Sequence, residues 1–284
     1  HVVNNSWYCG PADGCSLDVL QAPVEALRQA GIVVVVSAGN FGPGCETVSY
    51  PPTIYQPSFS VGGFNHRDDS VYYSSSRGPV TYGGETYIKP NISAPAVSVR
   101  SSLPLSLGYD GYGSLSGTSM AAPHVAGAVA LLLSAAPGYG GHVDTIEQIL
   151  TSTTEPMTTT QGCGGDGPSD VPNNVWGWGI LNSQAAVESL GTLQGTVTEA
   201  GDGRPIPMAW VAPDLATAPG TQTDLTGQYT LTLTAGVYTI TAEAACYLST
   251  TITNVSVISD SVEIQDIAME PAVCIYFPLI LRTE

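Results

Sequence analysis

Short apolar runs and helical stripes of apolar residues alternate along the first two thirds of the chain. Ile32 to Val36 is a continuous, β-branched run, which is typical of a strand covered on both faces. Ahead of it, apolar residues recur at spacings of three and four and predict a helix over Leu17, Leu20, Val24 and Leu27. Pro23 must start or kink that helix, and Gly31 is expected to end it. Strands that alternate with helices favour a doubly wound, mostly parallel α/β sheet.

Further helices are predicted downstream. The segment from Pro123 to Ala136 is apolar nearly all round, which indicates a buried helix. Asp144 and Glu147 have the spacing of a capping box at the start of the next helix. Asn182 and Gly191 bracket the last helix of this region. The α/β pattern therefore continues to the neighbourhood of Gly191.

The pattern changes after Gly191. From Leu193 to Glu270, short alternating segments rich in Thr, Val and Tyr are separated by turn residues, and the sequence shows no helical stripe there. Val237 to Thr241 alternates with a period of two. We therefore expect an α/β domain at 1–191, a small all-β sandwich domain at 192–271 and an apolar tail at 272–284.

The charge balance narrows the range of partners. The chain has 24 acidic side chains against 7 basic ones, a net charge of −17, and Lys89 is its one lysine. Such a surface repels a phosphate backbone, so nucleic acid is excluded as a partner. Cation binding and simple solubility outside a cell both remain open. No apolar run reaches the roughly 20 residues that cross a bilayer, so we expect no transmembrane segment.

Cysteine use points to an oxidising compartment. The six cysteines are compatible with disulfides, whose pairing composition leaves open, and they lack the paired spacing of a zinc site. Cys9 and Cys15 are close enough to close one loop. With lysine scarce and Thr, Ser and Tyr abundant, we expect a secreted protein. His1 opens the chain without Met or a cleavable apolar segment, so we expect the chain to start inside a longer sequence.

The segment from Gly117 to Gly127 carries the strongest chemical signal. It reads Gly-Thr-Ser-Met-Ala-Ala-Pro-His-Val-Ala-Gly, a serine among small residues just before the predicted buried helix. Gly117 allows close backbone approach, and a helix N-terminus directs unpaired amides towards Ser119. A nucleophile there has its developing oxyanion stabilised by its own amide. From spacing alone, a Ser or Thr that merely caps a core helix is the commoner explanation of this pattern.

All eleven residues resemble the nucleophile motif of the subtilisin-like serine proteases, the subtilases. The resemblance implies that Ser119 is the catalytic nucleophile and that His124, within the motif, is structural rather than a general base. Val34 to Asn40 resembles the family's buried strand that ends at the oxyanion-hole asparagine. Asn40 is accordingly the expected second donor to the oxyanion, a role whose loss costs about 3–4 kcal/mol, a magnitude measured on a subtilisin.

Other segments extend the resemblance over roughly residues 1–190. The substrate-binding residues that it implies form two groups, a strand whose backbone pairs with an extended peptide (Ser6, Trp7 and Tyr8) and a facing wall of the specificity pocket (Ser37, Ala38 and Gly39). The family usually has Asp where this chain has Asn91, and Gly where it has Ala96. If that glycine has a positive φ, Ala96 strains its loop by about 1 kcal/mol.

The triad is incomplete in this sequence. Subtilases carry their triad in the order Asp, His, Ser, and no segment of this chain resembles the Asp and His motifs. None of the four histidines, His1, His66, His124 and His142, lies in a matching context. A serine without its base is a poor nucleophile, so we expect the chain to be a fragment that is inactive alone.

The second domain resembles the carboxypeptidase-regulatory-like domain, a prealbumin-type β-sandwich. The similarity lies in turn residues and alternating segments, such as Asp202 to Pro207 and Thr223 to Tyr229. Asp202 and Asp224 are explained as turn formers, so no metal ligand is assigned, although structural calcium is compatible with the family. The module has no catalytic constellation, and we expect it to stabilise, space or attach the protein to a surface or polymer.

The family arrangement also implies disulfide pairs. Cys9–Cys15 and Cys45–Cys163 would lie in loops near the substrate cleft, and Cys246–Cys274 would tie the tail to the sandwich, each contributing about 2–4 kcal/mol.

The sequence thus predicts a secreted serine endopeptidase that hydrolyses peptide bonds through an acyl-enzyme on Ser119 and needs no organic cofactor. Two alternatives remain. One is a non-catalytic binding or adhesion protein on a degenerate protease scaffold. The other is an acyl hydrolase of another substrate class, which the peptide-pairing strand disfavours.

Overall fold

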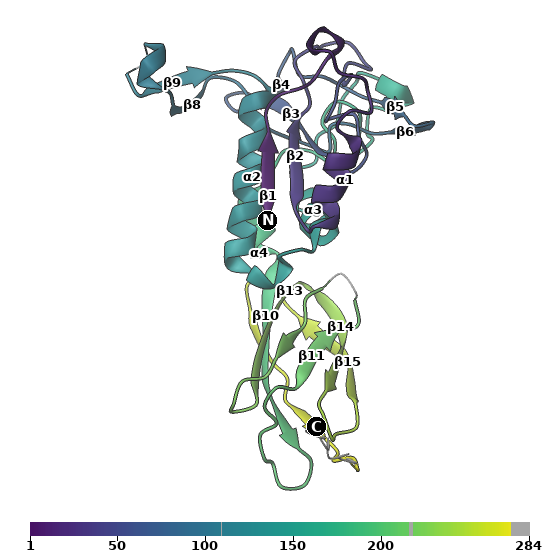
Figure 1. Cartoon of the computed structure of the whole chain (residues 1–284), viewed down its shortest axis with the longest axis vertical. Helices are drawn as coiled ribbons and strands as arrows, with labels where there is room; N and C mark the ends of the chain where they lie inside the picture. Colours follow the sequence, from purple (N-terminus) through teal and green to yellow (C-terminus); the bar gives the residue numbers. More distant parts are fainter. Residues whose placement is uncertain (109, 216–217, 274–284) are drawn as a thin grey trace, which may run out of the picture. The chain divides into compact units, whose positions relative to one another are not determined.

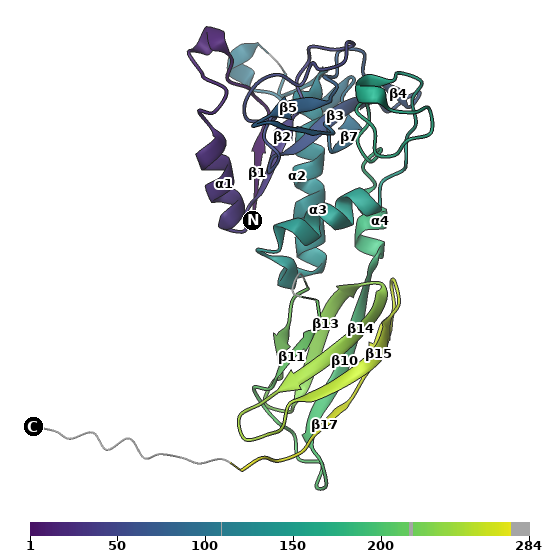
Figure 2. The same ribbon diagram turned by 90° about the vertical axis from the view of Figure 1, so that its right-hand side faces the viewer.

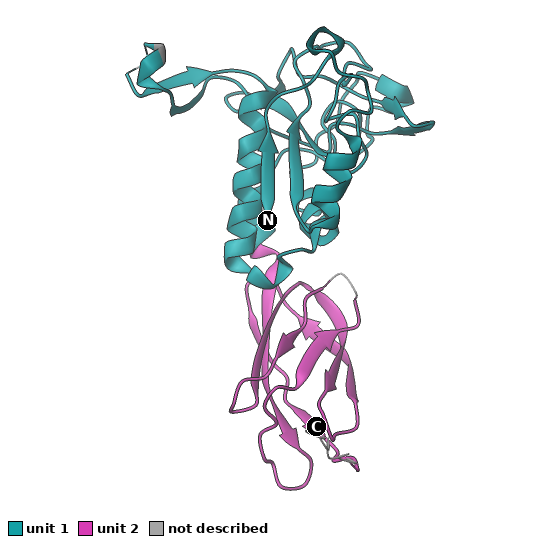
Figure 3. Ribbon diagram, in the orientation of Figure 1, with its two compact units in different colours: residues 1–187 teal, residues 188–284 magenta. Residues whose placement is uncertain are grey.

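The computed structural model describes residues 1–108, 110–215 and 218–273. Internal contacts divide the chain into two compact units, residues 1–187 and residues 188–284 (Figure 3). The first unit is α/β and the second contains strands, which confirms the expected fold classes. The expected tail at 272–284 lies, from residue 274 onwards, outside the described residues.

A five-stranded sheet forms the centre of the first unit. Strands β1 (Val2–Asn5), β2 (Val33–Ser37), β3 (Phe59–Asn65) and β7 (Ile92–Pro95) are parallel, and β4 (Ser70–Val71) pairs antiparallel with β3. All five residues of β2 are buried, as its unbroken apolar run predicts. One edge of the sheet is β1, which pairs with β2 alone among the described strands.

Helices lie on both faces of this sheet (Figures 1 and 2). Helix α1 (Gln21–Gln29) packs Val24 against Val34 and Val36 of β2. Helix α2 (Thr118–Ala135) lies across the other face. Helices α3 (Val143–Ser152) and α4 (Ser183–Glu188) follow.

Three helix predictions need correction. Helix α1 begins after Leu17, which is 50% exposed, because Pro23 falls in its first turn. Helix α2 begins before Pro123, at Thr118. The expected capping box of α3 is wrong: His142 is the N-cap residue and has no side-chain cap, since Asp144 and Glu147 both bind Arg28.

By length and composition, α2 is the one helix within the described ranges that could cross a membrane. A buried core helix passes the same test. The buried side chains of α2 include Ala121, Val125 and Leu132, which are those of a helix packed in a protein interior.

Two hairpins complete the first unit. Strands β5 (Val80–Tyr82) and β6 (Glu85–Tyr87) form one, and β8 (Val99–Ser102) and β9 (Tyr112–Leu115) form the other. The second hairpin extends away from the sheet and leads directly into α2 (Figure 1). Short 3-10 turns lie at Pro11–Asp13, Leu105–Leu107, Pro137–Tyr139 and Cys163–Gly165.

The second unit contains two sheets around one apolar core. The first sheet joins β10 (Leu190–Glu199), β13 (Gln228–Thr234), β16 (Val262–Ile264) and β17 (Ile267–Met269). The second sheet joins β11 (Trp210–Pro213), β12 (Thr221–Gln222), β14 (Gly236–Glu243) and β15 (Thr250–Val257). Residues of both sheets, such as Leu193 and Ile240, share the core. The period-two pattern in β14 places Tyr238, Ile240 and Ala242 inside, as expected.

Candidate active site

Ser119 lies in the first turn of α2, where it is partly buried. Gly117 caps this helix with φ of 147° and ψ of 160°, a conformation that residues with a Cβ rarely adopt. The Ser119 hydroxyl donates to the Ser6 carbonyl at 3.4 Å, and the Ser6 hydroxyl donates to the Ser119 carbonyl at 2.9 Å. These reciprocal bonds hold the first turn of α2 against the segment that follows β1.

Pro123 explains why the Ser119 carbonyl is available to Ser6. In a regular helix the carbonyl of residue 119 accepts the amide of residue 123, but proline has no amide hydrogen. The freed carbonyl oxygen accepts the Ser6 hydroxyl instead. A residue that the sequence marked only as a helix start therefore connects the nucleophile's turn to the sheet.

Asn40 follows β2 and faces the same turn of α2. Its Oδ1 accepts the Thr118 amide at 2.9 Å and the Thr118 hydroxyl at 3.1 Å. Because a backbone amide can only donate, the first of these bonds fixes which branch of the Asn40 amide is oxygen. The Nδ2 donor is left on the other branch of this exposed side chain, within 3.4 Å of where a Cβ on Gly117 would lie.

Thr118 hydrogen-bonds two of the predicted site residues, Asn40 and Gly39, and sequence reasoning missed it. It is fully buried, and its Oγ1 also accepts the Gly39 amide at 3.2 Å. Gly39 has φ of +105°, and a Cβ there would lie 2.8 Å from Ser76 Oγ, so the close approach requires glycine. The only sequence signal for Thr118 was its place between Gly117 and Ser119.

The expected strand at Ser6, Trp7 and Tyr8 is wrong, because β1 ends at Asn5 and these residues follow it. This segment and the predicted facing wall differ in exposure. Ser37 and Ala38 are buried, so they contribute backbone rather than side chain to a surface, and Gly39 is partly buried. Trp7 and Tyr8 are about half exposed, at 48% and 49%. The structure brings Ser6 to Ser119 and Asn40 to Thr118, while Trp7 contacts neither through a hydrogen bond within the described part of the chain.

Three aromatic rings near these two segments pack against one another. Tyr8 and Phe41 pack edge to face with ring centroids 5.3 Å apart. Tyr50 stacks on Tyr8 at 5.5 Å and packs edge to face on Phe41 at 5.4 Å. Phe41 is next to Asn40 in the sequence, but nothing in the sequence pointed to Tyr50. We call these three residues the aromatic cluster.

No histidine hydrogen-bonds to Ser119 within the described ranges. His124 Nδ1 bonds the Met120 carbonyl at 2.8 Å on its own helix, and His142 packs against Tyr139. His66 is exposed in the turn between β3 and β4. The expectation that His124 is not the general base is consistent with this geometry.

A buried lysine lies between β3 and β7 in hydrogen-bond contact with Ser58 and Asn91. Lys89 is 1% exposed, and its Nζ donates to the Ser58 carbonyl and, at 2.9 Å, to Asn91 Oδ1. Burial lowers the pKa of Lys89 to about 7, against a smaller opposing effect of Glu147. Ala96 is not among the described residues with positive φ, so the strain considered for it does not occur.

Arg28 ties α1 to α3 through two carboxylates. Its guanidinium forms a bidentate pair with Glu147 at 2.7 and 2.9 Å, and it also pairs with Asp144. The Glu147 side chain is 17% exposed and that of Asp144 is 81% exposed. Burial raises the pKa of Glu147, and Arg28 opposes that rise.

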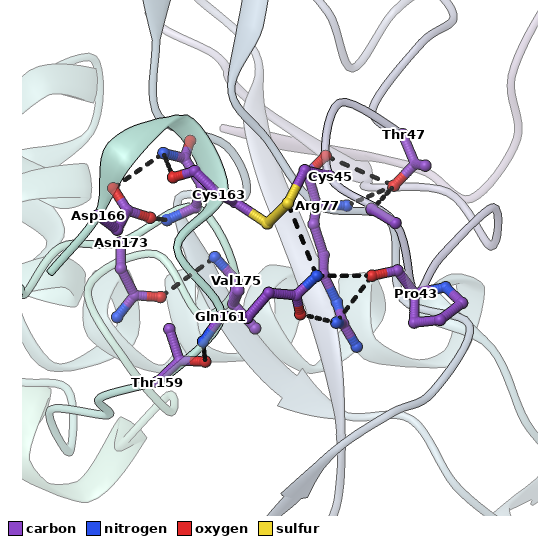
Figure 4. The surroundings of a disulfide bond; sticks show 12 residues. Pro43, Cys45, Thr47, Arg77, Thr159, Gln161, Cys163, Asp166, Asn173 and Val175 are labelled. Carbon is purple, nitrogen blue, oxygen red and sulfur yellow. Dashed lines mark hydrogen bonds between the residues drawn. A yellow bond between two sulfur atoms is a disulfide. The ribbon is translucent and has the colours of Figure 1, made fainter. Parts of the chain in front are cut away.

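Two of the expected disulfides, Cys9–Cys15 and Cys45–Cys163, are formed. Figure 4 shows Cys45–Cys163 with Gln161 and Arg77 below it, and both of these side chains donate to the Pro43 carbonyl, at 2.8 and 2.9 Å. This arrangement fixes the loop that follows Asn40. The third expected pair includes Cys274, which lies outside the described residues.

Arg77 is 5% exposed, and burial lowers its pKa.

No group of three or more His, Cys, Asp or Glu residues that could hold a metal ion occurs in the part of the chain that the structure describes.

Comparison with known protein families gives a match for each of the two units. Residues 1–179 match the subtilase family, and residues 192–270 match the carboxypeptidase regulatory-like domain. The chain therefore belongs to the subtilase family of serine proteases. A carboxypeptidase regulatory-like domain follows the subtilase domain in the sequence.

The chain is similar in sequence to several proteases. The chain is 38% identical over 215 residues to bacillopeptidase F of Bacillus subtilis (strain 168), covering 73% of this chain and 14% of that protein. It is 33% identical over 186 residues to the serine protease AprX of the same strain, covering 60% and 38%. It is 39% identical over 122 residues to a subtilisin of Bacillus pumilus, covering 42% and 39%. The chain thus spans well under half the length of these relatives.

Two solved structures resemble this chain. One is a protease from Pseudoalteromonas arctica PAMC 21717, with a TM-score of 0.47 and 28% identity over 66% of this chain and 50% of that one. The other is the prenylagaramide maturation protease PagA, with a TM-score of 0.48 and 24% identity over 66% and 61%.

Proposed function

We propose that the chain carries the nucleophile and oxyanion hole of a secreted serine endopeptidase. The observation that supports this proposal is the pairing of Asn40 Oδ1 with Thr118, which leaves Nδ2 as a donor 3.4 Å from the position of a Cβ on Gly117. Ser119 Oγ attacks the carbonyl carbon of a peptide bond and forms an acyl-enzyme, which water then hydrolyses. Asn40 Nδ2 and the first-turn amide of Ser119 stabilise the negative charge that develops on the carbonyl oxygen.

The peptide substrate lies along the segment from Ser6 to Tyr8. This segment follows the edge strand β1 (Val2–Asn5), and its backbone donors and acceptors bind an extended chain through groups that many sequences share. Ser37, Ala38 and Gly39 form the facing wall. Their small or buried side chains leave the backbone as the contact surface.

The general base and its carboxylate partner come from polypeptide outside residues 1–284. His66, His124 and His142 have other surroundings, as described above. The sheet edge at β1 and the outer face of α2, where Leu131 is 57% exposed, are the surfaces that such a segment would cover. Two disulfides support an extracellular location.

The complete coding sequence decides this proposal. Segments with the Asp and His motifs should lie in frame upstream of the codon for His1. The complete product should react with a fluorophosphonate probe and cleave casein, while Ser119→Ala should abolish both. An exported reading frame that begins near His1, or labelling that survives Ser119→Ala, would overturn the protease proposal and favour a binding protein.

A further inference from the structure

Two segments flank the candidate nucleophile. Residues 6–8 are tied to Ser119 by the reciprocal bonds of Ser6, and residues 39–41 are tied to Thr118 through Asn40 and Gly39. In the proposed reaction the attacked carbon lies at Ser119 Oγ, with its oxygen towards Asn40. The residue that supplies this carbonyl is therefore flanked by both segments, and its side chain must fit the space between them.

Rings from the two segments are in contact within the aromatic cluster. Tyr8 belongs to the first segment and Phe41 to the second, and their ring centroids are 5.3 Å apart, which is direct contact. A side chain inserted between two rings needs a van der Waals contact of about 3.5–4.0 Å on each side, or roughly 7 Å in total. Tyr50 packs against both rings and prevents either from turning away without losing a partner.

Covalent and hydrogen bonds hold the cluster in place. Cys9, next to Tyr8, forms the Cys9–Cys15 disulfide, and its amide donates to the Pro51 carbonyl at 2.9 Å, beside Tyr50. The Phe41 amide donates to Ser76 Oγ at 3.1 Å. The segments that bear Tyr8 and Phe41 are therefore held in place without a substrate. Separating the two rings would cost contacts that a bound side chain must replace.

We propose that Tyr8, Phe41 and Tyr50 close the pocket beside Ser119, so that the protease accepts Gly, Ala or Ser and rejects large side chains at the residue whose carbonyl is attacked. The three rings carry no charge, so the selection is by size. This inference rests on the proposed function, because it assigns the specificity of the same site.

The test uses the complete gene product and two peptide p-nitroanilides that differ only in the residue attacked, Ala or Phe. The unmodified protein should cleave the Ala substrate with kcat/KM at least about tenfold above that of the Phe substrate. Tyr8→Ala should raise the ratio of kcat/KM for the Phe substrate to kcat/KM for the Ala substrate at least about tenfold. Phe41→Ala should act in the same direction. Trp210→Ala, an exposed aromatic residue of the second unit, is the matched control and should change neither rate.

A preference for Phe in the unmodified protein would overturn the inference. So would a Tyr8→Ala variant that cleaves the Phe substrate more slowly, since the ring would then be a contact surface for the substrate. Fluorophosphonate labelling of Ser119 in each variant reports folding independently of side-chain preference, and Phe41→Ala provides the answer if Tyr8→Ala does not fold. Absence of Ser119-dependent labelling in the unmodified protein would refute the proposed function itself.

Discussion

Thr118 donates its amide and its hydroxyl to a single atom, Oδ1 of Asn40. One end of the Asn40 amide is thus held by two hydrogen bonds, while the other end, the Nδ2 donor, lies 3.4 Å from the position of a Cβ on Gly117. Preorganisation of this kind makes a hydrogen-bond donor effective in catalysis, because no reorientation is needed when charge develops.

Thr118→Val should lower kcat about tenfold in the complete gene product and leave KM within about twofold. The valine keeps the amide bond to Asn40 but removes the hydroxyl that also accepts the Gly39 amide. Asn40→Ala, which removes the donor itself, should cost about 100–1,000-fold in kcat. Thr118→Ser keeps the hydroxyl and is the control. An unchanged kcat in Thr118→Val would show that the second bond does not position Asn40.

Stability should rise with pH through the range in which Lys89 differs between the folded and unfolded chain. Burial lowers the pKa of Lys89 from 10.5 to about 7. Between these values the unfolded chain holds the proton and the folded chain does not, so raising the pH favours folding. The free energy of unfolding should increase by up to about 1.4 kcal/mol per pH unit, and the stability gained should be lost as pH falls towards 7.

Urea denaturation at several pH values between about 7 and about 10 measures this dependence. Lys89→Met should flatten it. Asn91→Asp should also flatten it, because a carboxylate beside Nζ would raise the pKa of Lys89. The same slope in Lys89→Met and in the unmodified protein would assign the dependence to other groups.

Arg28→Ala should destabilise the first unit by about 2–4 kcal/mol, because it leaves Glu147 largely buried without its partner. Asp144→Asn provides the contrast, since that carboxylate is 81% exposed and should contribute less than about 1 kcal/mol. Chemical denaturation of the two variants compares the effects. Equal losses would mean that exposure does not set the strength of these two pairs.

The two disulfides should differ in their contribution to stability. Cys45 and Cys163 are 118 residues apart, whereas Cys9 and Cys15 are 6 apart. Replacing the first pair by alanine should cost about 4–5 kcal/mol and the second about 2 kcal/mol, since the longer loop restricts the unfolded chain more. Denaturation midpoints of the two double variants provide the comparison. A larger loss for Cys9–Cys15 would point to folded-state contacts rather than loop closure.

Local sequence was sufficient where local pattern sets the structure. The unbroken run of β2 predicted its burial, and the motif around Ser119 placed a serine at the start of a core helix. Local sequence gave a wrong prediction where a residue distant in the sequence binds the same side chains. Asp144 and Glu147 have capping-box spacing, but Arg28, from another helix, binds both. The aromatic cluster combines Tyr8, Phe41 and Tyr50 from separate loops, and no periodic pattern links such positions.

Pro123 has a consequence for how the nucleophile is located. Because Pro123 has no amide hydrogen to donate to the Ser119 carbonyl, that oxygen accepts the Ser6 hydroxyl, which ties the first turn of α2 to the segment after β1. A shift of α2 along its axis relative to this segment has to break the bond between Ser6 and Ser119. The position of the Ser119 hydroxyl is therefore set by the segment that follows the sheet's edge strand as well as by its own helix.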